Sequence, residues 1–138
     1  MPELTETAVR PTTNEPLMRD VYAALARGNM DTIRAIFAPD CLTHIPGNNP
    51  LSGDKRGVEE LIAYFGQLMA RSEGTFAIDL QQVMSNAGYV VGFHHETGHT
   101  AGRTLDNQLT VVARIENALA REVWVFYFDQ AQADAFWR

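Results

Sequence analysis

The stretch that decides the fold is YVVGFHHETGHTAGRTLDNQLTVVARIENALAREVWVFYF, residues 89–128. Apolar and polar side chains alternate along most of it, and this period of two predicts strands at 89–97, 103–115 and 121–128. Short turns that contain glycine, asparagine or alanine separate these strands. Consecutive strands joined by such short turns pair as hairpins, so the stretch predicts an antiparallel sheet.

Working outward toward the N-terminus, the pattern changes from strands to helices. One more strand is expected at 76–84, joined to the next by a turn at 85–88. A helix is expected over Val58–Arg71, because its apolar residues recur at the i, i+3, i+4, i+7 spacing of a single helical face. Gly74 ends this helix.

The first third of the chain carries signals for two further helices. The first is expected over 14–28, since an Asn-Glu-Pro sequence suits a helix start and a glycine suits its end. A second, short helix is expected around 33–37, closed by a proline. A short strand over Cys41–Ile45 then leads into a loop over Pro46–Asp54, which is rich in turn-forming residues. Helices first and strands later predict an α+β fold, with the helices packed on one face of the sheet.

The composition is that of one small acidic domain. The 138 residues correspond to about one domain, which we place at 14–138, after a polar and flexible leader at 1–13. The net charge of −6 argues against nucleic acid or an anionic membrane as a partner, because both need clustered Lys and Arg. No apolar run approaches the ~18 residues of a membrane span, and the leader lacks the apolar core of a signal peptide. The lone Cys41 is expected to be a small buried hydrophobe, and a cytoplasmic protein is favoured.

The strand at 89–97 indicates where a binding site lies. Gly92, His94 and Glu96 share one of its faces because side chains alternate along a strand. A glycine inside a strand leaves space where a side chain would be. Space beside a histidine and a carboxylate predicts a pocket for a small molecule.

The two strands that follow add further candidates. Asn107 is the one amide on an otherwise apolar face, and a buried amide needs partners from the protein, water or a ligand. The last strand collects large aromatic side chains on one face, where they form either core or pocket wall: Trp124, Phe126 and Phe128.

A metal-binding motif occurs in the sequence but not in the right structural setting. The run His95-Glu96-Thr97-Gly98-His99 matches the H-E-x-x-H pattern of zinc proteases. That chemistry needs a helix, which places both histidines on one face. On a strand the two histidines lie ~13 Å apart, too far for one metal ion. Phosphate-binding glycine loops are also missing from the sequence, so we expect no metal, nucleotide or flavin.

Three runs carry a resemblance to a known group of proteins. They are YAALARGNMDTIRAIFAPD, HIPGNNPLSGDKRGVEELIAYFGQL and EVWVFYFDQ, and together they resemble the ketosteroid isomerase and nuclear transport factor 2 superfamily. Within it the chain is most similar to SnoaL-like proteins, over about 14–137. The resemblance implies a cone-shaped, cystatin-like α+β barrel. Three N-terminal helices would pack in the concave face of a strongly bent, mainly antiparallel sheet, around an apolar pocket, in a homodimer.

The resemblance also assigns positions to the reactive groups of ketosteroid isomerases. Their catalytic tyrosine falls on Val21, one residue from Tyr22, and their aspartic acid donor falls on Val111. The oxyanion hole therefore looks absent, and steroid isomerisation is not expected. Their catalytic base falls on His44 or on Ile45, depending on which side of the following loop anchors the comparison.

SnoaL-like cyclases imply a further acid and the walls of the pocket. They use an aspartate near the end of the last strand, which corresponds most nearly to Asp129. That residue has the wrong parity to face the pocket unless a β-bulge intervenes. The resemblance also places Tyr64 and Phe65 on the helix that lines the pocket, with Asn107 pointing the same way.

The function expected from these observations is general acid/base catalysis on an apolar small molecule, of isomerase, cyclase, epoxide hydrolase or dehydratase type and without a cofactor. His44 is the expected base, and His94 and Asp129 are the other proton-transfer candidates. One alternative is a non-catalytic module that binds a ligand or dimerises. Another is an assembly protein, which predicts a large exposed apolar patch outside the cone. The expected substrate contacts are Tyr64, Phe65, Glu96, Asn107, Trp124, Phe126 and Phe128.

Overall fold

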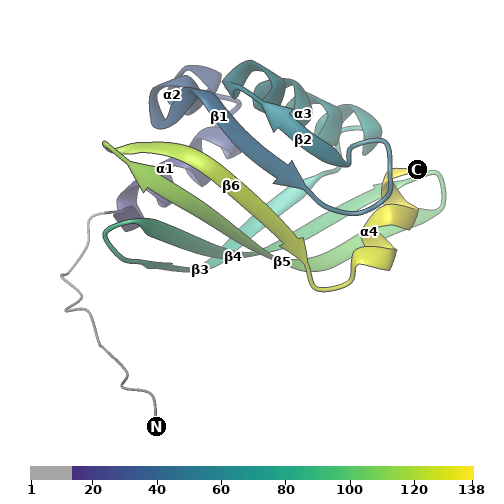
Figure 1. The fold of residues 1–138 in the computed structure, drawn as a ribbon. Coiled ribbons are helices and arrows are strands. Elements are labelled where there is room, and N and C mark those ends of the chain that lie inside the picture. The colour runs from purple at the N-terminus through teal and green to yellow at the C-terminus, as the bar shows by residue number, and fades with distance from the viewer. Residues whose placement is uncertain (1–13) are drawn as a thin grey trace, which may run out of the picture.

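The computed structural model describes residues 14–138, and the leader expected at 1–13 lies outside the described residues. Within that range helices and strands follow one another as Figure 1 shows. The helices are α1 (Asn14–Arg27), α2 (Met30–Ile36), α3 (Val58–Arg71) and α4 (Gln130–Trp137). The strands are β1 (Phe37–Ile45), β2 (Gly53–Arg56), β3 (Ala77–Ser85), β4 (Tyr89–Thr100), β5 (Arg103–Glu116) and β6 (Leu119–Tyr127).

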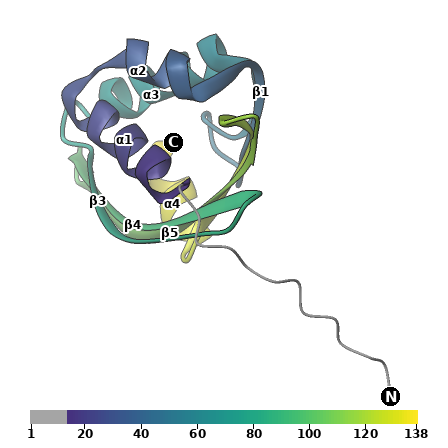
Figure 2. The same ribbon diagram turned by 90° about the vertical axis from the view of Figure 1, so that its left-hand side faces the viewer.

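All of these strands belong to one sheet, in the order β2-β1-β6-β5-β4-β3. Strands β1 and β6 pair in parallel, and every other neighbouring pair is antiparallel. The sheet curves around α1, and α2 and α3 close the open side of the curve (Figure 2). The fold predicted from the sequence, helices in the concave face of a bent and mainly antiparallel sheet, is confirmed.

The bend of the sheet has local causes in its strands. β3 carries an extra residue between Leu80 and Gln82, and β6 carries one, Arg121, opposite the step from Arg114 to Ile115. An extra residue on one strand of a pair bends that strand and increases its twist. These irregularities turn a flat sheet into a wall that surrounds the helices.

The inner surfaces of α1 and α3 form the core with the concave face of the sheet. Helix α1 buries Met18, Val21 and Ala24, which recur at the spacing of one helical face. Helix α3 presents a corresponding stripe that includes Leu61 and Leu68. Both helices lie where their sequence patterns predicted them.

Helix α4 was not predicted from the sequence. Asp129 caps its N-terminus by accepting a hydrogen bond from the backbone N–H of Gln132. Its last two aromatic residues, Phe136 and Trp137, are buried. The helix therefore packs against β5 and β6 and covers one end of the sheet.

The hairpins also differ in detail from the sequence prediction. Strand β1 begins at Phe37, four residues before the expected start, and its pairing is irregular between Phe37 and Leu42, around the proline. Strand β2 forms where a loop was expected, pairing His44 with Asp54. Strands β4 and β5 continue up to a tight turn at Ala101–Gly102, where both residues have positive φ.

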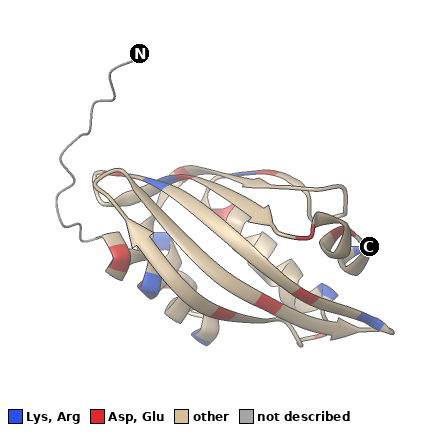
Figure 3. Cartoon of the chain, turned by 90° about the horizontal axis from the view of Figure 1, so that it is seen from below, with Lys and Arg blue, Asp and Glu red and all other residues tan. Residues whose placement is uncertain are grey.

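The described helices include none that is long and apolar enough to cross a membrane. Lys and Arg residues of residues 14–138 are scattered over helices and strands rather than gathered on one face (Figure 3).

Candidate functional site

The inner face of β4 carries two polar residues into the core. His94 and Glu96 are each 4% exposed, and both face the concave side of the sheet. The space above Gly92 is taken by α1, since a Cβ placed on that glycine would lie 3.2 Å from the hydroxyl of Tyr22. The glycine therefore allows the Tyr22 side chain to reach His94.

Tyr22, His94 and Glu96 form a hydrogen-bonded chain. The Tyr22 hydroxyl lies 2.5 Å from Nδ1 of His94, and Nε2 of His94 lies 2.8 Å from Oε2 of Glu96. A carboxylate only accepts hydrogen bonds, so Nε2–H donates to Glu96. Nδ1 then keeps its lone pair and accepts a hydrogen bond from the Tyr22 hydroxyl. The imidazole is thus held in one tautomer with its basic nitrogen toward Tyr22.

Two more phenols extend this chain across the cavity wall. The hydroxyl of Tyr127 donates to Oε1 of Glu96 at 3.1 Å, and Tyr64 lies next to Tyr127. Burial, and after it the Glu96 carboxylate, raises the pKa of Tyr22 above that of an ordinary phenol. The same two causes raise the pKa of Tyr64 and of Tyr127. All three hydroxyls therefore remain protonated and able to donate at neutral pH.

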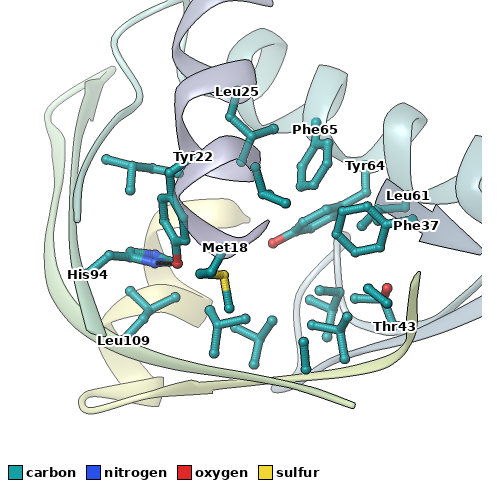
Figure 4. Close-up of a pocket in the computed structure, with 18 of the residues that line it drawn as sticks. Met18, Tyr22, Leu25, Phe37, Thr43, Leu61, Tyr64, Phe65, His94 and Leu109 are labelled. Atoms are coloured by element: carbon teal, nitrogen blue, oxygen red, sulfur yellow. Dashed lines mark hydrogen bonds between the residues drawn. The ribbon is translucent and has the colours of Figure 1, made fainter. Parts of the chain in front are cut away.

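All of these groups except Tyr127 line an apolar cavity of about 80 Å³. Figure 4 shows Tyr22 and His94 together on one side, and the hydroxyl of Tyr64 pointing into the space. Met18 and Leu109 lie beside them, and the rest of the wall is largely aliphatic and aromatic. Polar groups are few and grouped, as in pockets that bind small apolar molecules.

One polar atom of the cavity wall has no partner. Oγ1 of Thr43 is buried, in a side chain that is 1% exposed, and it makes no hydrogen bond within the described residues. Figure 4 shows Thr43 across the cavity from His94. A buried hydroxyl without a partner is costly, and a ligand oxygen or nitrogen would supply one.

The structure brings four of the expected site residues to this cavity. His94 and Glu96 lie in the polar chain, and Tyr64 and Phe65 contribute to the wall from α3. Strand parity and helical spacing had placed all four on inward faces.

His44 is placed differently from the sequence expectation. Its neighbours Thr43 and Ile45 line the cavity, so the alternation of β1 turns His44 to the opposite, outer face of the sheet. There its Nδ1 lies 2.8 Å from Asp54 and its Nε2 lies 2.6 Å from Glu122. The hydrogen bond to Glu122, with a contribution from Asp54, outweighs burial and raises the pKa of His44. The expectation that His44 faces the pocket is wrong, and of the two aligned positions Ile45 is the one on the cavity.

The aromatic face of the last strand also points outward. Trp124 stacks on His44, with ring centroids 5.7 Å apart, on the outer side of the sheet. Phe126 is 52% exposed and Phe128 is 67% exposed. The cavity is lined instead by valines that alternate with them along the strand, Val123 and Val125. The expected pocket wall of Trp124, Phe126 and Phe128 is therefore wrong, because the parity of the strand was assigned to the opposite face.

Asn107 and Asp129 lie together outside the cavity. The Asn107 amide donates to the carbonyl of Asp129 at 2.7 Å and accepts from its backbone N–H at 3.1 Å. The Asp129 carboxylate is used to cap α4. Both the nitrogen and the oxygen of the Asn107 amide thus have a protein partner, and the pair joins β5 to the start of α4. The expectation that these two residues face the substrate pocket is wrong, because neither lines the cavity.

The residues that sequence reasoning missed are Tyr22, Thr43 and Tyr127. Tyr22 follows Met18 by four positions, so the helical period puts both on the same inner face. Tyr127 shares its strand parity with Val123, which marks the inner face of β6 once that face is identified. Helical and strand periodicity therefore contain the signal for these residues, but the large aromatic residues of β6 favoured its outer face.

The described residues contain no group of three or more His, Cys, Asp or Glu that could hold a metal ion. The H-E-x-x-H run lies on β4, as expected for a strand. His95 pairs with Asp106 at 2.6 Å on the outer face. The run is therefore divided between an outer surface and the cavity.

Comparisons with known proteins agree with this architecture. Residues 18–123 match the SnoaL-like domain model. Uncharacterized protein Rv0034 of Mycobacterium tuberculosis is 32% identical over 122 residues, which cover 88% of this chain and 93% of that protein. Bal32a, from a soil-derived mobile gene cassette, is 32% identical with a TM-score of 0.87, over 91% of this chain and 96% of Bal32a.

Two further solved structures show the same fold. A Xanthomonas campestris protein of unknown function with a cystatin-like fold has a TM-score of 0.84 at 32% identity, over 91% of this chain and 98% of that one. IdmH of Streptomyces antibioticus, named as a candidate polyketide cyclase, has a TM-score of 0.72 at 17% identity, over 88% of this chain and 99% of IdmH, and shares the fold alone. On its curved sheet, its helices and these matches, the chain belongs to the SnoaL-like family, with the fold of nuclear transport factor 2.

Proposed function

We propose that this protein is a small-molecule enzyme that moves protons within its apolar cavity. Tyr22 and His94 are the exchanging groups, and Glu96 is their charged partner. The observation that carries the proposal is the hydrogen-bonded chain of these three side chains, buried at the wall of a cavity that is otherwise apolar. A histidine oriented by a carboxylate is a common general base.

When the site acts as a general base, Tyr22 and His94 together remove a proton from the substrate. The Tyr22 oxygen accepts the proton while its own proton passes to Nδ1 of His94. The imidazolium that forms is stabilised by Glu96, to which Nε2–H is already bonded. The low polarity of the surroundings strengthens this ion pair relative to water.

When the site acts as a general acid, the same hydrogen-bonded chain returns the proton to the substrate. The imidazolium donates from Nδ1 to the Tyr22 oxygen, and the Tyr22 hydroxyl protonates an oxygen of the substrate. Isomerisation, dehydration, epoxide opening and cyclisation all need a proton removed at one atom and delivered at another. Cyclisation is the reaction for which the fold relative IdmH is named.

Two hydroxyls on the cavity wall are suited to hold the substrate. Tyr64 points its hydroxyl into the space (Figure 4), and Thr43 offers a hydroxyl without a protein partner. A carbonyl or hydroxyl group of the substrate bonded to Thr43 would be oriented across the cavity from His94. This arrangement supports an apolar substrate with at least one oxygen.

The test uses a reaction that needs only proton transfer. Deuterium exchange at the central carbon of an enolisable β-diketone is followed by NMR with the wild-type protein, Tyr22→Phe and His94→Gln. The matched control is His95→Gln, which changes the neighbouring histidine on the outer face. We expect exchange to fall by ~10²–10⁴-fold in both cavity variants and to stay at the wild-type rate in the control.

Equal exchange rates in all four folded proteins would overturn the proposal. Tight binding of the diketone without exchange would favour the non-catalytic ligand-binding alternative. Circular dichroism of each variant shows whether it is folded, so that a loss of activity is not a loss of structure.

A second candidate role rests on the outer face of the sheet. Phe126 and Phe128 are exposed there, beside Trp124 and charged groups of both signs such as Arg114 and Glu122. An exposed apolar patch with mixed charge suits pairing with a second copy by a two-fold axis. We propose a homodimer through this face. Sedimentation of the wild-type protein and of the double variant Phe126→Ser and Phe128→Ser tests it, and a wild-type monomer at micromolar concentration would exclude it.

A further inference from the structure

A larger hollow lies beside the cavity. It is a groove of about 800 Å³ bordered by α1, α3 and β3. Most of its lining side chains are apolar, and they include Met30 and Phe76 at positions where the helices meet the sheet edge. The groove is ten times as large as the cavity that holds the proton-transfer groups.

The groove and the cavity share a wall. The side chains of Tyr22, Leu25, Phe65, Leu68 and Ile78 line both of them. Figure 4 shows Leu25 and Phe65 at the edge of the cavity, away from Thr43. The two hollows are therefore separated by side chains alone, and rotation of Leu25 and Phe65 would join them.

The volume of the cavity requires such a connection. An engineered cavity of about 150 Å³ in a protein core binds benzene, whereas the cavity beside His94 has about 80 Å³. A substrate of even modest size that reaches the Tyr22 hydroxyl must extend beyond the cavity. The groove is the adjoining space that shares Tyr22 with it.

One charged residue marks the edge of the groove. Arg19 is the only ionisable cation or anion among the described residues that line it, other than the phenol of Tyr22. No acidic side chain within residues 14–138 forms an ion pair with Arg19, in contrast to Arg34, which pairs with Glu59. An apolar surface with a single free guanidinium at its edge complements a molecule with a long apolar body and one acidic end.

We propose that the groove and the cavity together bind an elongated apolar carboxylate. Its acidic end lies at Arg19, its apolar body fills the groove along α1 and α3, and its reacting end enters the cavity between Leu25 and Phe65. The identity of the reacting end rests on the proposed function, whereas binding in the groove does not.

The test measures binding rather than turnover. Calorimetric titration with dodecanoate is compared with dodecan-1-ol, which has the same chain without the charge. The groove is blocked by Gly66→Phe, because Gly66 lines the groove and a Cβ at this position meets no atom within 4 Å. The charge is removed by Arg19→Gln.

Each variant has a matched control on the same helix. Ala63→Phe adds the same ring to α3 outside both hollows, and Arg27→Gln removes a charge from α1 outside the groove. We expect the wild-type protein to bind dodecanoate at least tenfold more tightly than the alcohol. Gly66→Phe and Arg19→Gln should each weaken dodecanoate binding about tenfold or more, and the controls should match the wild type.

The outcomes separate this proposal from the proposed function. No binding of dodecanoate, or binding that Gly66→Phe leaves unchanged, overturns the groove site even if proton exchange depends on Tyr22 and His94. Equal binding of acid and alcohol overturns the assignment of the acidic end to Arg19. Groove binding with the expected variant effects supports the site even if Tyr22→Phe leaves exchange unchanged.

Discussion

The hydroxyl of Tyr22 and Nδ1 of His94 lie 2.5 Å apart, although 72 residues separate them in the chain. One belongs to the first helix and the other to the middle of a strand, so their hydrogen bond forms only when α1 is seated in the concave face of the sheet. The arrangement links the position of α1 to the hydrogen bonding of the histidine. It also means that changes to this bond affect stability and chemistry together.

Replacement of Tyr22 by Phe removes the hydroxyl and keeps the ring. We expect the free energy of unfolding to fall by about 1–3 kcal/mol, because Nδ1 of His94 is left buried without a partner. Urea denaturation measures this change. An unchanged midpoint would show that the bond contributes nothing to the folded state, and His95→Gln provides the comparison on the outer face.

The environment of His44 predicts a pH dependence of stability. Its pKa is raised in the folded state by Glu122 and Asp54, so the folded protein binds a proton more tightly than the unfolded chain does. The resulting stabilisation is complete below the unfolded pKa of about 6.5 and is lost as the pH rises through the folded pKa. We expect the wild-type protein to lose more stability than His44→Gln over this alkaline interval. NMR titration of the His44 ring checks the cause, and a pKa at or below the ordinary value would contradict it.

Replacement of Thr43 by Val exchanges the unpartnered hydroxyl for a methyl group of similar size. We expect the ligand-free protein to become more stable by about 1 kcal/mol or more, because a buried polar group without a hydrogen bond is removed. Binding of a ketone in the cavity should weaken at the same time. Thermal unfolding without ligand and calorimetric titration with the ketone measure the two effects. A loss of stability in the ligand-free protein would show that the hydroxyl already has a partner.

Asn107 is predicted to hold helix α4 in place. Replacement by Ala removes the hydrogen bonds to the backbone N–H and to the carbonyl of Asp129, at a cost of about 0.5–1.5 kcal/mol for each bond lost. Asp129→Ala removes only the helix cap and should cost less, about 0.5–2 kcal/mol. Hydrogen exchange of the α4 amides shows whether this helix opens first. Equal costs for the two variants would contradict the different roles assigned to them.

The sequence was sufficient for the fold and for part of the site. Alternation along β4 placed Gly92, His94 and Glu96 on one face, and the helix period placed Tyr64 inward. These predictions hold because a strand or helix that faces a core keeps a fixed period, whatever else surrounds it.

The remaining site residues depend on relations that no local pattern contains. Strand β6 carries apolar side chains on both faces, so its sequence does not tell whether Trp124 or Val123 faces the helices. The answer depends on the direction in which the whole sheet bends. The role of Asn107 depended on α4, an eight-residue helix whose weak local signal left the partner of the amide unknown.

The parallel pairing of β1 with β6 has a consequence for how the protein is made. One edge of β1 pairs with β2 soon after it is made, but on the other edge His44 is in register with Trp124, so that edge has no partner until almost all of the later chain exists. At the usual speed of the ribosome this delay is on the order of 10 s. During that time the nascent chain displays one unpaired edge of β1, which chaperones or a neighbouring copy on the same messenger can bind. Co-translational folding of this protein is therefore completed only when its last strand leaves the exit tunnel.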